Sequence, residues 1–372
     1  MTEIYLVRHA QAEGNLYKMF QGHWDGGITK LGWKQLDDLA ERFASVRLDA
    51  VYASDLFRAM ATGAAVGRSA DLKPIPVPDL REIHVGVWEG EFFADVKWTD
   101  PEKLQAFVSD PAVWQVEGSE TYSIVRDRAT AALIRLAEEN EGKTIAAASH
   151  GVTIRSILWG ILGGDLKNSS VLPIFGNTSV THLFYENGRF TVDYMNDTSH
   201  LKEDSLFPWK NSTELRAEPI DFSRDAAFYT GCYSDAWAAT HADLSGFDAS
   251  AYLEAARAHQ AADGHAVLMF YDRDVPAGLL DLNTRKGEGD GYGWVSFLYL
   301  APEYRGRGCA AQVLARAIRH YDRLGRRTIR LSVNSSNEKA LAFYDRLGFS
   351  ERSRQRSAGS TVLCLERPIR EV

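Results

Sequence analysis

The stretch "LVRHAQAEGN" (residues 6–15) decides the fold of the first half of this chain. It completes a short apolar strand, "EIYLVRH", with Arg8 and His9 side by side at the strand's end. The next segment, "ITKLGWKQLDDLAERFASV", carries apolar residues at helical spacing behind Thr29, which we expect to cap the helix. Strands and helices continue to alternate as far as "KTIAAASH" and "GVTIRSILWGILG". This order predicts an α/β fold, a mostly parallel sheet with helices on both faces.

Polar residues of this half stand where its strands end. Arg8 and His9 follow the first strand, and Arg58 comes shortly after the second, "DAVYASD". His150 ends the strand "KTIAAASH", and "LREIHVGVWEG" offers Glu82. Because ligands collect at the carboxyl ends of parallel strands, we expect these five side chains to converge at one edge of the sheet.

Two histidines, two arginines and a glutamate are suited to phosphoryl transfer through a histidine. Arginine presents a fork of donors that matches phosphate oxygens. A histidine that attacks phosphorus must be neutral, and neighbouring guanidinium charges lower its pKa. The leaving alkoxide needs a proton, which a carboxyl group facing a phosphate anion can supply. Glu89 and Glu91 compete with Glu82 for that last role.

These motifs resemble the histidine phosphatase superfamily, also called the phosphoglycerate-mutase-like family, over residues 1–201. The resemblance rests on "LVRHAQAEGN", "ITKLGWKQ", "YASDLFRAMATG", "LREIHVGVWEG", "ASHG" and "NDTSHL". One departure is Ala10, where the family usually has glycine. The resemblance implies that His9 is the phosphorylated nucleophile and Glu82 the proton donor, with no metal required. It also implies that the phosphoryl group is bound by Arg8, Asn15, Arg58 and His150.

Hydrolysis and mutase transfer are both compatible with such a site. A mutase must keep and return the phosphoryl group, which requires a larger pocket that excludes water. The stretch "FFADVKWTDPEKLQAFVSDPAVWQVEGSE" is of modest length and does not resemble the mutase substrate segment. Its end, "VEGSE", resembles the phosphatase branch. We therefore expect hydrolysis of a small-molecule phosphate ester, with a phosphomutase as the alternative.

A polar segment, residues 197–219, interrupts the alternation of strands and helices. It contains two prolines and no sustained period, and we place the linker itself at residues 202–214. The expected domains are then residues 1–201 and 215–372. The second has a different order of elements: two helices, three strands, a helix, a strand, a helix and a final hairpin. This order predicts an α+β domain with a mixed, largely antiparallel sheet.

The loop "RGRGCA" (residues 305–310) is the richest motif of the second half. It follows the alternating strand "WVSFLYL" and opens an amphipathic helix. Its glycines let backbone N–H groups approach a phosphate, and the helix N-terminus adds a positive dipole. Glycine-rich loops are often only turns, so the interpretation depends on the surrounding sequence.

Together with "NSSNEKALAFYDRLGF", this loop resembles the GNAT family of acetyl-CoA-dependent N-acetyltransferases, over residues 215–367. The resemblance implies that Tyr344 protonates the departing thiolate and that the acceptor is a small amine or a peptide amine. Glu288 and Asp290 either attract that amine or belong to a solvated hairpin. The resemblance also implies that acetyl-CoA is bound by Leu300, Arg305, Gly306, Arg307, Gly308, Cys309, Ala310 and Asn337.

The leading hypothesis is therefore a bifunctional enzyme, a phosphatase fused to an acetyltransferase. The alternative is a phosphatase regulated by an acetyl-CoA-sensing module that transfers nothing. This alternative stays open because the sequence shows no evident base for the acceptor amine.

Composition sets the remaining expectations. The chain has 372 residues, enough for two domains, and a formal net charge of −8, which argues against nucleic acid as a partner. It contains no apolar run of about 18 residues, so we expect no membrane span. Cys232, Cys309 and Cys364 show neither a disulfide framework nor metal-ligand spacing. We expect a cytoplasmic protein without a metal.

Overall fold

The computed structural model describes residues 1–163, 172, 174–207, 213–239, 244, 246–357 and 360–370. The chain divides into two compact units, residues 1–208 and 209–372, and each is described here by itself. This division falls inside the predicted 202–214 linker, of which residues 208–212 lie outside the described residues.

The first unit contains a six-stranded sheet in the order β3-β2-β4-β1-β5-β6. Four of its strands are parallel: β1 (Thr2–Arg8), β2 (Ala50–Ala53), β3 (Ile75–Pro76) and β4 (Thr144–Ser149). β5 (Val180–Glu186) lies antiparallel to β1 and forms a hairpin with β6 (Arg189–Asp197). The sheet confirms the predicted mostly parallel architecture.

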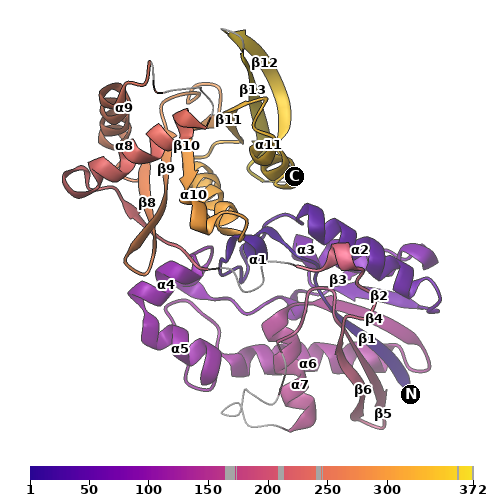
Figure 1. Cartoon of the computed structure of the whole chain (residues 1–372). Coiled ribbons are helices and arrows are strands. Elements are labelled where there is room, and N and C mark those ends of the chain that lie inside the picture. Colours follow the sequence, from indigo (N-terminus) through magenta and orange to yellow (C-terminus); the bar gives the residue numbers. More distant parts are fainter. Residues whose placement is uncertain are drawn as a thin grey trace. The chain divides into compact units, whose positions relative to one another are not determined.

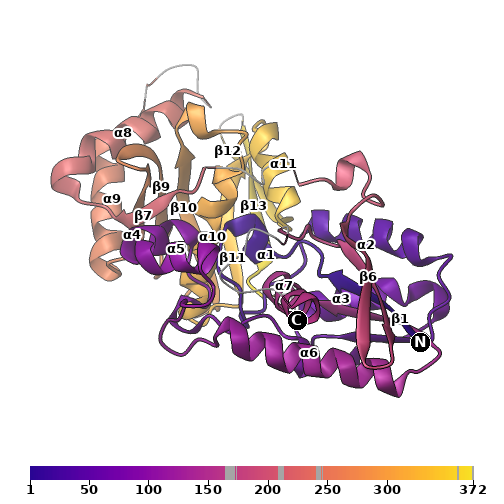
Figure 2. The same ribbon diagram turned by 90° about the horizontal axis from the view of Figure 1, so that it is seen from below.

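Helices cover both faces of this sheet (Figures 1 and 2). α2 and α3 lie on one face and α6 and α7 on the other. Thr29 caps α2 as predicted, because its hydroxyl accepts a hydrogen bond from the Gly32 amide at 2.9 Å. The helices are α1 (Glu13–Tyr17), α2 (Lys30–Phe43), α3 (Phe57–Val66), α4 (Phe93–Thr99), α5 (Pro101–Ser109), α6 (Tyr122–Glu139) and α7 (Gly151–Leu162).

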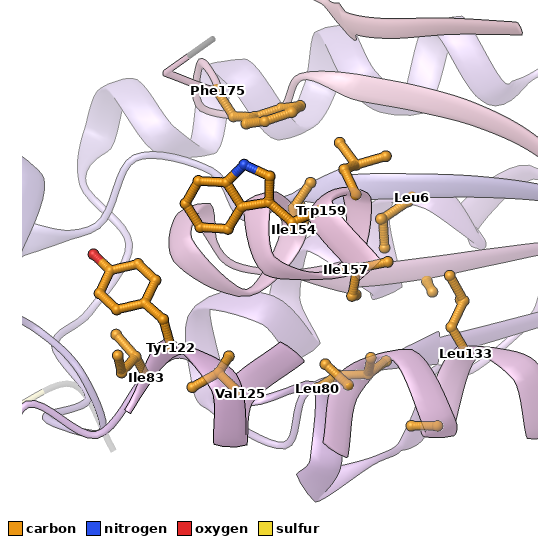
Figure 3. Close-up of a cluster of buried hydrophobic side chains, with 14 of the residues drawn as sticks. Leu6, Leu80, Ile83, Tyr122, Val125, Leu133, Ile154, Ile157, Trp159 and Phe175 are labelled. Atoms are coloured by element: carbon orange, nitrogen blue, oxygen red, sulfur yellow. The ribbon is translucent and has the colours of Figure 1, made fainter. Parts of the chain in front are cut away.

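Successive residues of β1 face two different cores. Ile4 and Leu6 pack into the cluster formed with α6 and α7, which Figure 3 shows in close-up. Val7 packs into a second cluster with α2 and α3. A strand buried on both faces takes a central place in a parallel sheet. The end of β1, with Arg8 and His9, is therefore held firmly at the carboxyl edge of the sheet.

The second unit is built on a seven-stranded sheet in the order β12-β13-β11-β10-β9-β8-β7. Among the described strand pairs, β10 and β11 are parallel and the others antiparallel, as predicted. The predicted order of elements lacks a strand at residues 216–219, which pair with β8. The strands are β7 (Arg216–Pro219), β8 (Val267–Asp272), β9 (Val275–Asn283), β10 (Tyr292–Leu300), β11 (Thr328–Asn334), β12 (Ser350–Ser357) and β13 (Ser360–Pro368).

The helices described beside this sheet are α8 (Phe222–Ala238), α9 (Ala249–Ala262), α10 (Cys309–Arg323) and α11 (Glu338–Arg346). α8 and α9 reach the face that bears Asp281 of β9. α10 covers the opposite face, where a Cβ on Gly293 would meet the Tyr321 ring at 2.2 Å. Within the described residues, no helix is both long and apolar enough to cross a membrane.

β10 and β11 pair along only part of their length. Their parallel register joins Tyr292–Val295 of β10 to Thr328–Leu331 of β11. A bulge follows in β10 between Val295 and Phe297, and β10 continues beside β9 alone. The carboxyl ends of β10 and β11 therefore part from each other just before the loop that leads into α10.

Candidate active sites

His9, at the carboxyl end of β1, is the centre of the first candidate site. Its Nδ1 lies 2.7 Å from the carbonyl oxygen of Ala10. A carbonyl only accepts hydrogen bonds, so Nδ1 carries the proton and Nε2 keeps its lone pair. Burial and the charges of Arg58 and Arg8 hold the pKa of His9 well below its ordinary value of 6.5. The imidazole is therefore neutral, and the lone pair of Nε2 is available to a bound group.

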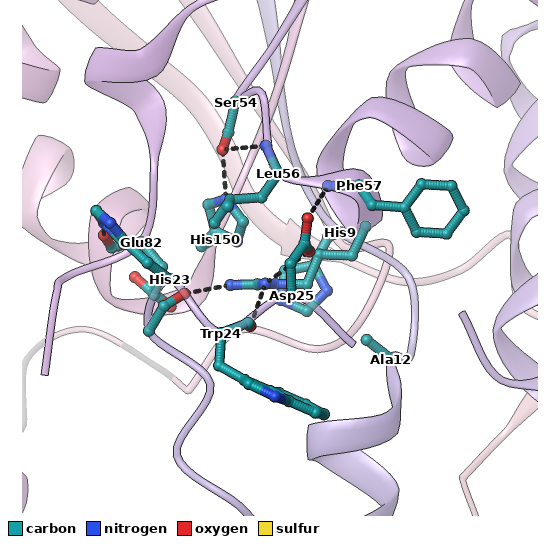
Figure 4. A network of polar contacts seen from close by, with 12 residues as sticks. His9, Ala12, His23, Trp24, Asp25, Ser54, Leu56, Phe57, Glu82 and His150 are labelled. Atoms are coloured by element: carbon teal, nitrogen blue, oxygen red, sulfur yellow. Dashed lines mark hydrogen bonds and ion pairs between the residues drawn. The ribbon is translucent and has the colours of Figure 1, made fainter. Parts of the chain in front are cut away.

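His150 lies beside His9 because β1 and β4 are neighbouring parallel strands. The register pairs Arg8 with Ser149, so the residues that follow each strand are adjacent, and the two imidazole centroids are 5.2 Å apart. His150 Nε2 is 2.8 Å from the Ser54 hydroxyl oxygen, the contact drawn in Figure 4. Burial, followed by the charge of Arg58, holds the pKa of His150 well below 6.5.

Arg58 brings a fully buried guanidinium group from the first turn of α3. It donates hydrogen bonds to the carbonyl oxygens of Gly22 at 2.7 Å and Trp24 at 3.1 Å, and its Nη1 lies 3.3 Å from Asp25 Oδ1. These contacts hold the guanidinium group against the loop before α2. Burial lowers its pKa, and the charge of Asp25 opposes that effect.

Arg8 approaches the same region from the end of β1. Its guanidinium group donates a hydrogen bond to the carbonyl oxygen of Phe175. It also lies over the N-terminus of α7, because a Cβ on Gly151 would come within 3.4 Å of Arg8 Nε.

Three buried nitrogen atoms of these residues have no hydrogen-bond partner in the part of the chain that the structure describes. They are Arg8 Nε, Arg58 Nε and His150 Nδ1. Buried polar atoms are nearly always paired, so each exception requires an explanation. An anion bound beside His9 would provide one, because both guanidinium nitrogens are charged donors.

Glu82 is held at the N-terminus of α7, next to His150. Its Oε1 accepts hydrogen bonds from the amide and the hydroxyl of Thr153 at 3.0 and 3.1 Å, and Oε2 accepts one from the Val152 amide at 3.2 Å. The backbone oxygen of Glu82 accepts hydrogen bonds from Arg128 at 3.1 Å and His23 at 2.9 Å. Both the side chain and the backbone are thus fixed in place.

Glu89, a competitor of Glu82 in the sequence, has a different role. Its carboxylate accepts hydrogen bonds from the backbone amides of His23 at 3.0 Å, Trp24 at 2.6 Å and Val85 at 3.0 Å. These contacts tie together the two loops that hold Arg58 and Glu82. Glu89 therefore organises the backbone around the site.

The second candidate site is the loop that opens α10. Gly306 and Gly308 have positive φ angles of 73° and 79°, a conformation that favours glycine. Gly308 is the N-cap of α10 and no side chain caps the helix there. The first-turn amides, beginning at Cys309 and Ala310, are therefore available to an anion, and Arg307 is exposed beside them.

Arg305 helps to close the turn through two hydrogen bonds to backbone oxygens. Its amide donates to the carbonyl oxygen of Pro302 at 3.2 Å, and its Nε donates to that of Leu300 at 2.8 Å. Cys309 is fully buried, and burial raises the pKa of its thiol. The thiol is thus a packing group at neutral pH and not a thiolate.

Asn337 and Tyr344 both belong to α11. The Asn337 side chain caps the helix, accepting a hydrogen bond from the Ala340 amide at 3.1 Å. Tyr344 is buried, and burial raises the pKa of its phenol to about 12. Glu288 is exposed and lies 3.2 Å from Arg326 in an ion pair.

Comparison with known proteins identifies both units. The profile of the histidine phosphatase superfamily (branch 1) matches residues 4–198, more than half of the chain. The chain belongs to the histidine phosphatase superfamily. The profile of the acetyltransferase (GNAT) family matches residues 227–349, so a GNAT domain follows the histidine phosphatase domain.

The relatives of the histidine phosphatase domain include enzymes named as phosphatases. The domain is 32% identical over 208 residues to the metal-independent phosphoserine phosphatase of Arabidopsis thaliana. The match covers 54% of this chain and 84% of that protein. The domain is 30% identical over 205 residues to phosphoserine phosphatase 1 of Hydrogenobacter thermophilus, covering 55% and 96% respectively. The solved structure of Bacillus stearothermophilus YhfR is 29% identical, with a TM-score of 0.52, and covers 54% of this chain and 99% of that one.

Sequence reasoning missed one residue at the centre of the histidine phosphatase site. Asn177 donates hydrogen bonds from Nδ2 to the backbone oxygen of His9 at 3.1 Å and to Asn15 Oδ1 at 3.3 Å. It therefore joins two of the predicted site residues. A signal was present, because the polar run "GNTS" precedes β5, and β5 is antiparallel to β1 and starts where β1 ends.

Within the described residues, no three His, Cys, Asp or Glu side chains gather in a way that could hold a metal ion.

Proposed function

We propose that the histidine phosphatase domain hydrolyses a small phosphomonoester through a phosphohistidine at His9. The observation that carries this proposal is the neutral, buried imidazole, with Nε2 unprotonated and three unpartnered nitrogens around it. Such an arrangement is poised to receive an anionic group and to attack it.

In the first step His9 Nε2 forms a bond to phosphorus, and the bond from phosphorus to the leaving oxygen breaks. Glu82 donates a proton to that oxygen. Arg8 and Arg58 stabilise the charge on the equatorial oxygens, assisted by His150 and Asn15. In the second step water attacks the phosphohistidine, Glu82 takes up a proton from the water, and phosphate leaves.

The names of the relatives suggest phosphoserine as the first substrate to try. The chemistry of the site requires only a phosphomonoester, and proton donation by Glu82 matters most when the leaving group is poor. A phosphomutase is the alternative, and it predicts return of the phosphoryl group to an acceptor instead of release of phosphate.

Rapid quenching of the full chain with ³²P-labelled phosphoserine and other small phosphomonoesters tests this proposal. We expect acid-labile label on the peptide that contains His9, and release of labelled phosphate at steady state. Label on any other residue contradicts the assignment of the nucleophile. Label that moves to an added phosphate acceptor without phosphate release favours the mutase.

For the second unit we propose acetyl transfer from acetyl-CoA to an amine. The loop fits a pyrophosphate, because its two glycines with positive φ present the backbone and its helix begins without a capping side chain. Residues 306–310 would hold that group, with Leu300 and Asn337 nearby along the cofactor and Arg305 shaping the turn. Tyr344, protonated at neutral pH, would donate its proton to the departing thiolate.

The test is release of free CoA thiol with a panel of small amines and peptide amines. We expect turnover with at least one of them. Stabilisation of the protein by acetyl-CoA without turnover would favour the sensing module instead.

These two activities would make the chain a bifunctional enzyme with its linker at residues 202–214. The three cysteines are free thiols, which suits a reducing compartment, and we propose that the enzyme acts in the cytoplasm.

A further inference from the structure

The GNAT domain holds a buried carboxylate that none of the roles above uses. Asp281 of β9 is 1% exposed. Its Oδ2 accepts a hydrogen bond from the Tyr229 hydroxyl of α8 at 2.8 Å. Its Oδ1 lies 2.6 Å from Nδ1 of His259 on α9. A buried charge requires such partners. Because one partner is a histidine, the contact also affects the protonation of that imidazole.

The contact with Asp281 decides which nitrogen of His259 carries the proton. An ionised carboxylate only accepts hydrogen bonds, so Nδ1 donates, and in the neutral imidazole Nε2 keeps its lone pair. Nε2 has no hydrogen-bond partner among the described residues, and the side chain is 16% exposed. An imidazole backed by a buried carboxylate, with its second nitrogen unprotonated, is the arrangement of a general base.

The strand register places Asp281, the partner of His259, next to the opening between β10 and β11. Asp281 is paired across the sheet with Phe297, the first residue after the bulge in β10. The parallel pairing with β11 ends at Val295, immediately before that bulge. Neighbouring strands are about 4.8 Å apart, so Asp281 is one strand away from the point where β10 and β11 part.

We propose that His259, oriented by Asp281 and Tyr229, is the base that takes the proton from the acceptor amine. This inference rests on the acetyl transfer proposed above, with the thioester lying in the opening between β10 and β11. The amine nitrogen forms a bond to the acetyl carbon, and the carbon–sulfur bond breaks. One amine proton passes to His259 Nε2, and the thiolate takes the phenolic proton of Tyr344. The Asp281 carboxylate stays ionised and stabilises the imidazolium.

A second histidine–carboxylate pair of the same domain provides a matched control. His320 Nε2 lies 2.7 Å from Asp263 Oδ2, and the His320 side chain is 16% exposed, as is that of His259. This pair joins the end of α9 to α10 and not to the sheet. Its loss therefore reports what a contact of this kind contributes to folding alone.

The experiment uses the full chain and compares His259→Gln with His320→Gln. Acetyl-CoA binding is measured by calorimetry, and thiol release is measured with primary amines of graded basicity. We expect His259→Gln to lower kcat by about 100-fold or more, with acetyl-CoA affinity unchanged. The loss should be smaller for weakly basic amines such as hydroxylamine, which are already neutral at pH 7. His320→Gln should retain the kcat of the parent.

The outcomes separate this inference from the function on which it rests. If the parent chain transfers acetyl groups and His259→Gln does so at the same rate, His259 is not the base. The acetyl transfer proposed above would then still hold. Acetyl-CoA binding by the parent chain without transfer to any amine overturns both.

Two further measurements guard against a variant that fails to fold. Asp281→Asn keeps an acceptor for Tyr229 but can present an N–H to His259, which favours the wrong tautomer, so kcat should fall at unchanged acetyl-CoA affinity. ¹⁵N NMR of the parent chain reads the tautomer without any turnover. A proton on Nε2 of neutral His259 would overturn the inference.

Discussion

The two candidate sites of this chain are assembled in opposite ways. The phosphoryl site consists of buried side chains from separate segments, with Arg58 and His150 at 0% exposure and His9 at 2%. The candidate cofactor loop consists of consecutive residues, 305–310, of which 305–307 are exposed. A site of converging side chains depends on strand register and tolerates no loss of a functional group. A backbone cradle depends on a few φ angles and tolerates most changes that preserve them.

Replacing the nucleophile should have the largest effect. We expect His9→Ala to lower phosphatase kcat by about 10⁴-fold or more, because the variant lacks the imidazole proposed to carry the phosphoryl group. Acetyl-CoA binding, measured by calorimetry on the same preparation, should be unchanged. His182→Ala is the matched control, since His182 is another buried histidine of this unit but is bonded to Asp193 and Glu3. Equal loss of activity in both variants would mean that only folding was affected.

Changing the proton donor should affect substrates unequally. Glu82→Gln keeps oxygen and shape, so Thr153 and Val152 should still hold the side chain. We expect kcat for alkyl phosphates to fall by about 10²- to 10⁴-fold, with a much smaller fall for p-nitrophenyl phosphate, whose leaving group needs no proton. Parallel kinetics with the two esters provide the measurement. Equal slowing of both would contradict a role in leaving-group protonation.

A side chain at the cradle should act through the backbone. Gly308→Val places a β-branched residue at a φ of 79°, a strain of about 1–2 kcal/mol, and puts atoms where the amides would meet a pyrophosphate. We expect acetyl-CoA affinity to fall at least about tenfold, with phosphatase kinetics unchanged. Gly325→Val is the control, because Gly325 has a φ of 68° and open space around it. An affinity equal to that of the control would remove the cofactor from this loop.

Acid should gradually lower the free energy of unfolding of the first unit. The pKa values of His9 and His150 are held well below 6.5 in the folded chain. As the pH falls below 6.5, the unfolded chain takes up these protons and the folded chain does not, so the free energy of unfolding decreases. The slope is about 1.4 kcal/mol per pH unit for each group. Hydrogen exchange of peptides around β1 and β4 at about pH 7.5 and 5.5 measures it, and equal protection at both would contradict the shifts.

Local sequence was sufficient to predict the features that depend on interactions between residues close together in the chain. The Thr29 cap, for example, needs only residues three positions apart. The alternation of apolar strands and helices predicted the parallel sheet. It missed β7, because the polar residues 216–219 pair only with a strand about fifty positions later in the chain.

The partners of the site residues could not be predicted in the same way. The carbonyl oxygens that hold Arg58 lie in an irregular loop 34 and 36 residues earlier. Asp281 meets His259 and Tyr229 at separations of 22 and 52 residues, and no motif marks any of the three. Such contacts follow from how helices pack on sheets, and spacing along the chain does not encode them.

The amino-acid sequence by itself determined which chemical groups this protein has and which strand ends and helix starts carry them. It could do so because hydrophobic periodicity and helix capping act over a few residues. Only the tertiary structure decided their protonation and orientation. Burial and neighbouring guanidinium charges make His9 neutral. The contact of Nδ1 with a carbonyl oxygen leaves the lone pair of His9 on Nε2, and strand pairing brings His150 beside His9. These properties depend on distances in space, and the folded sheet sets those distances.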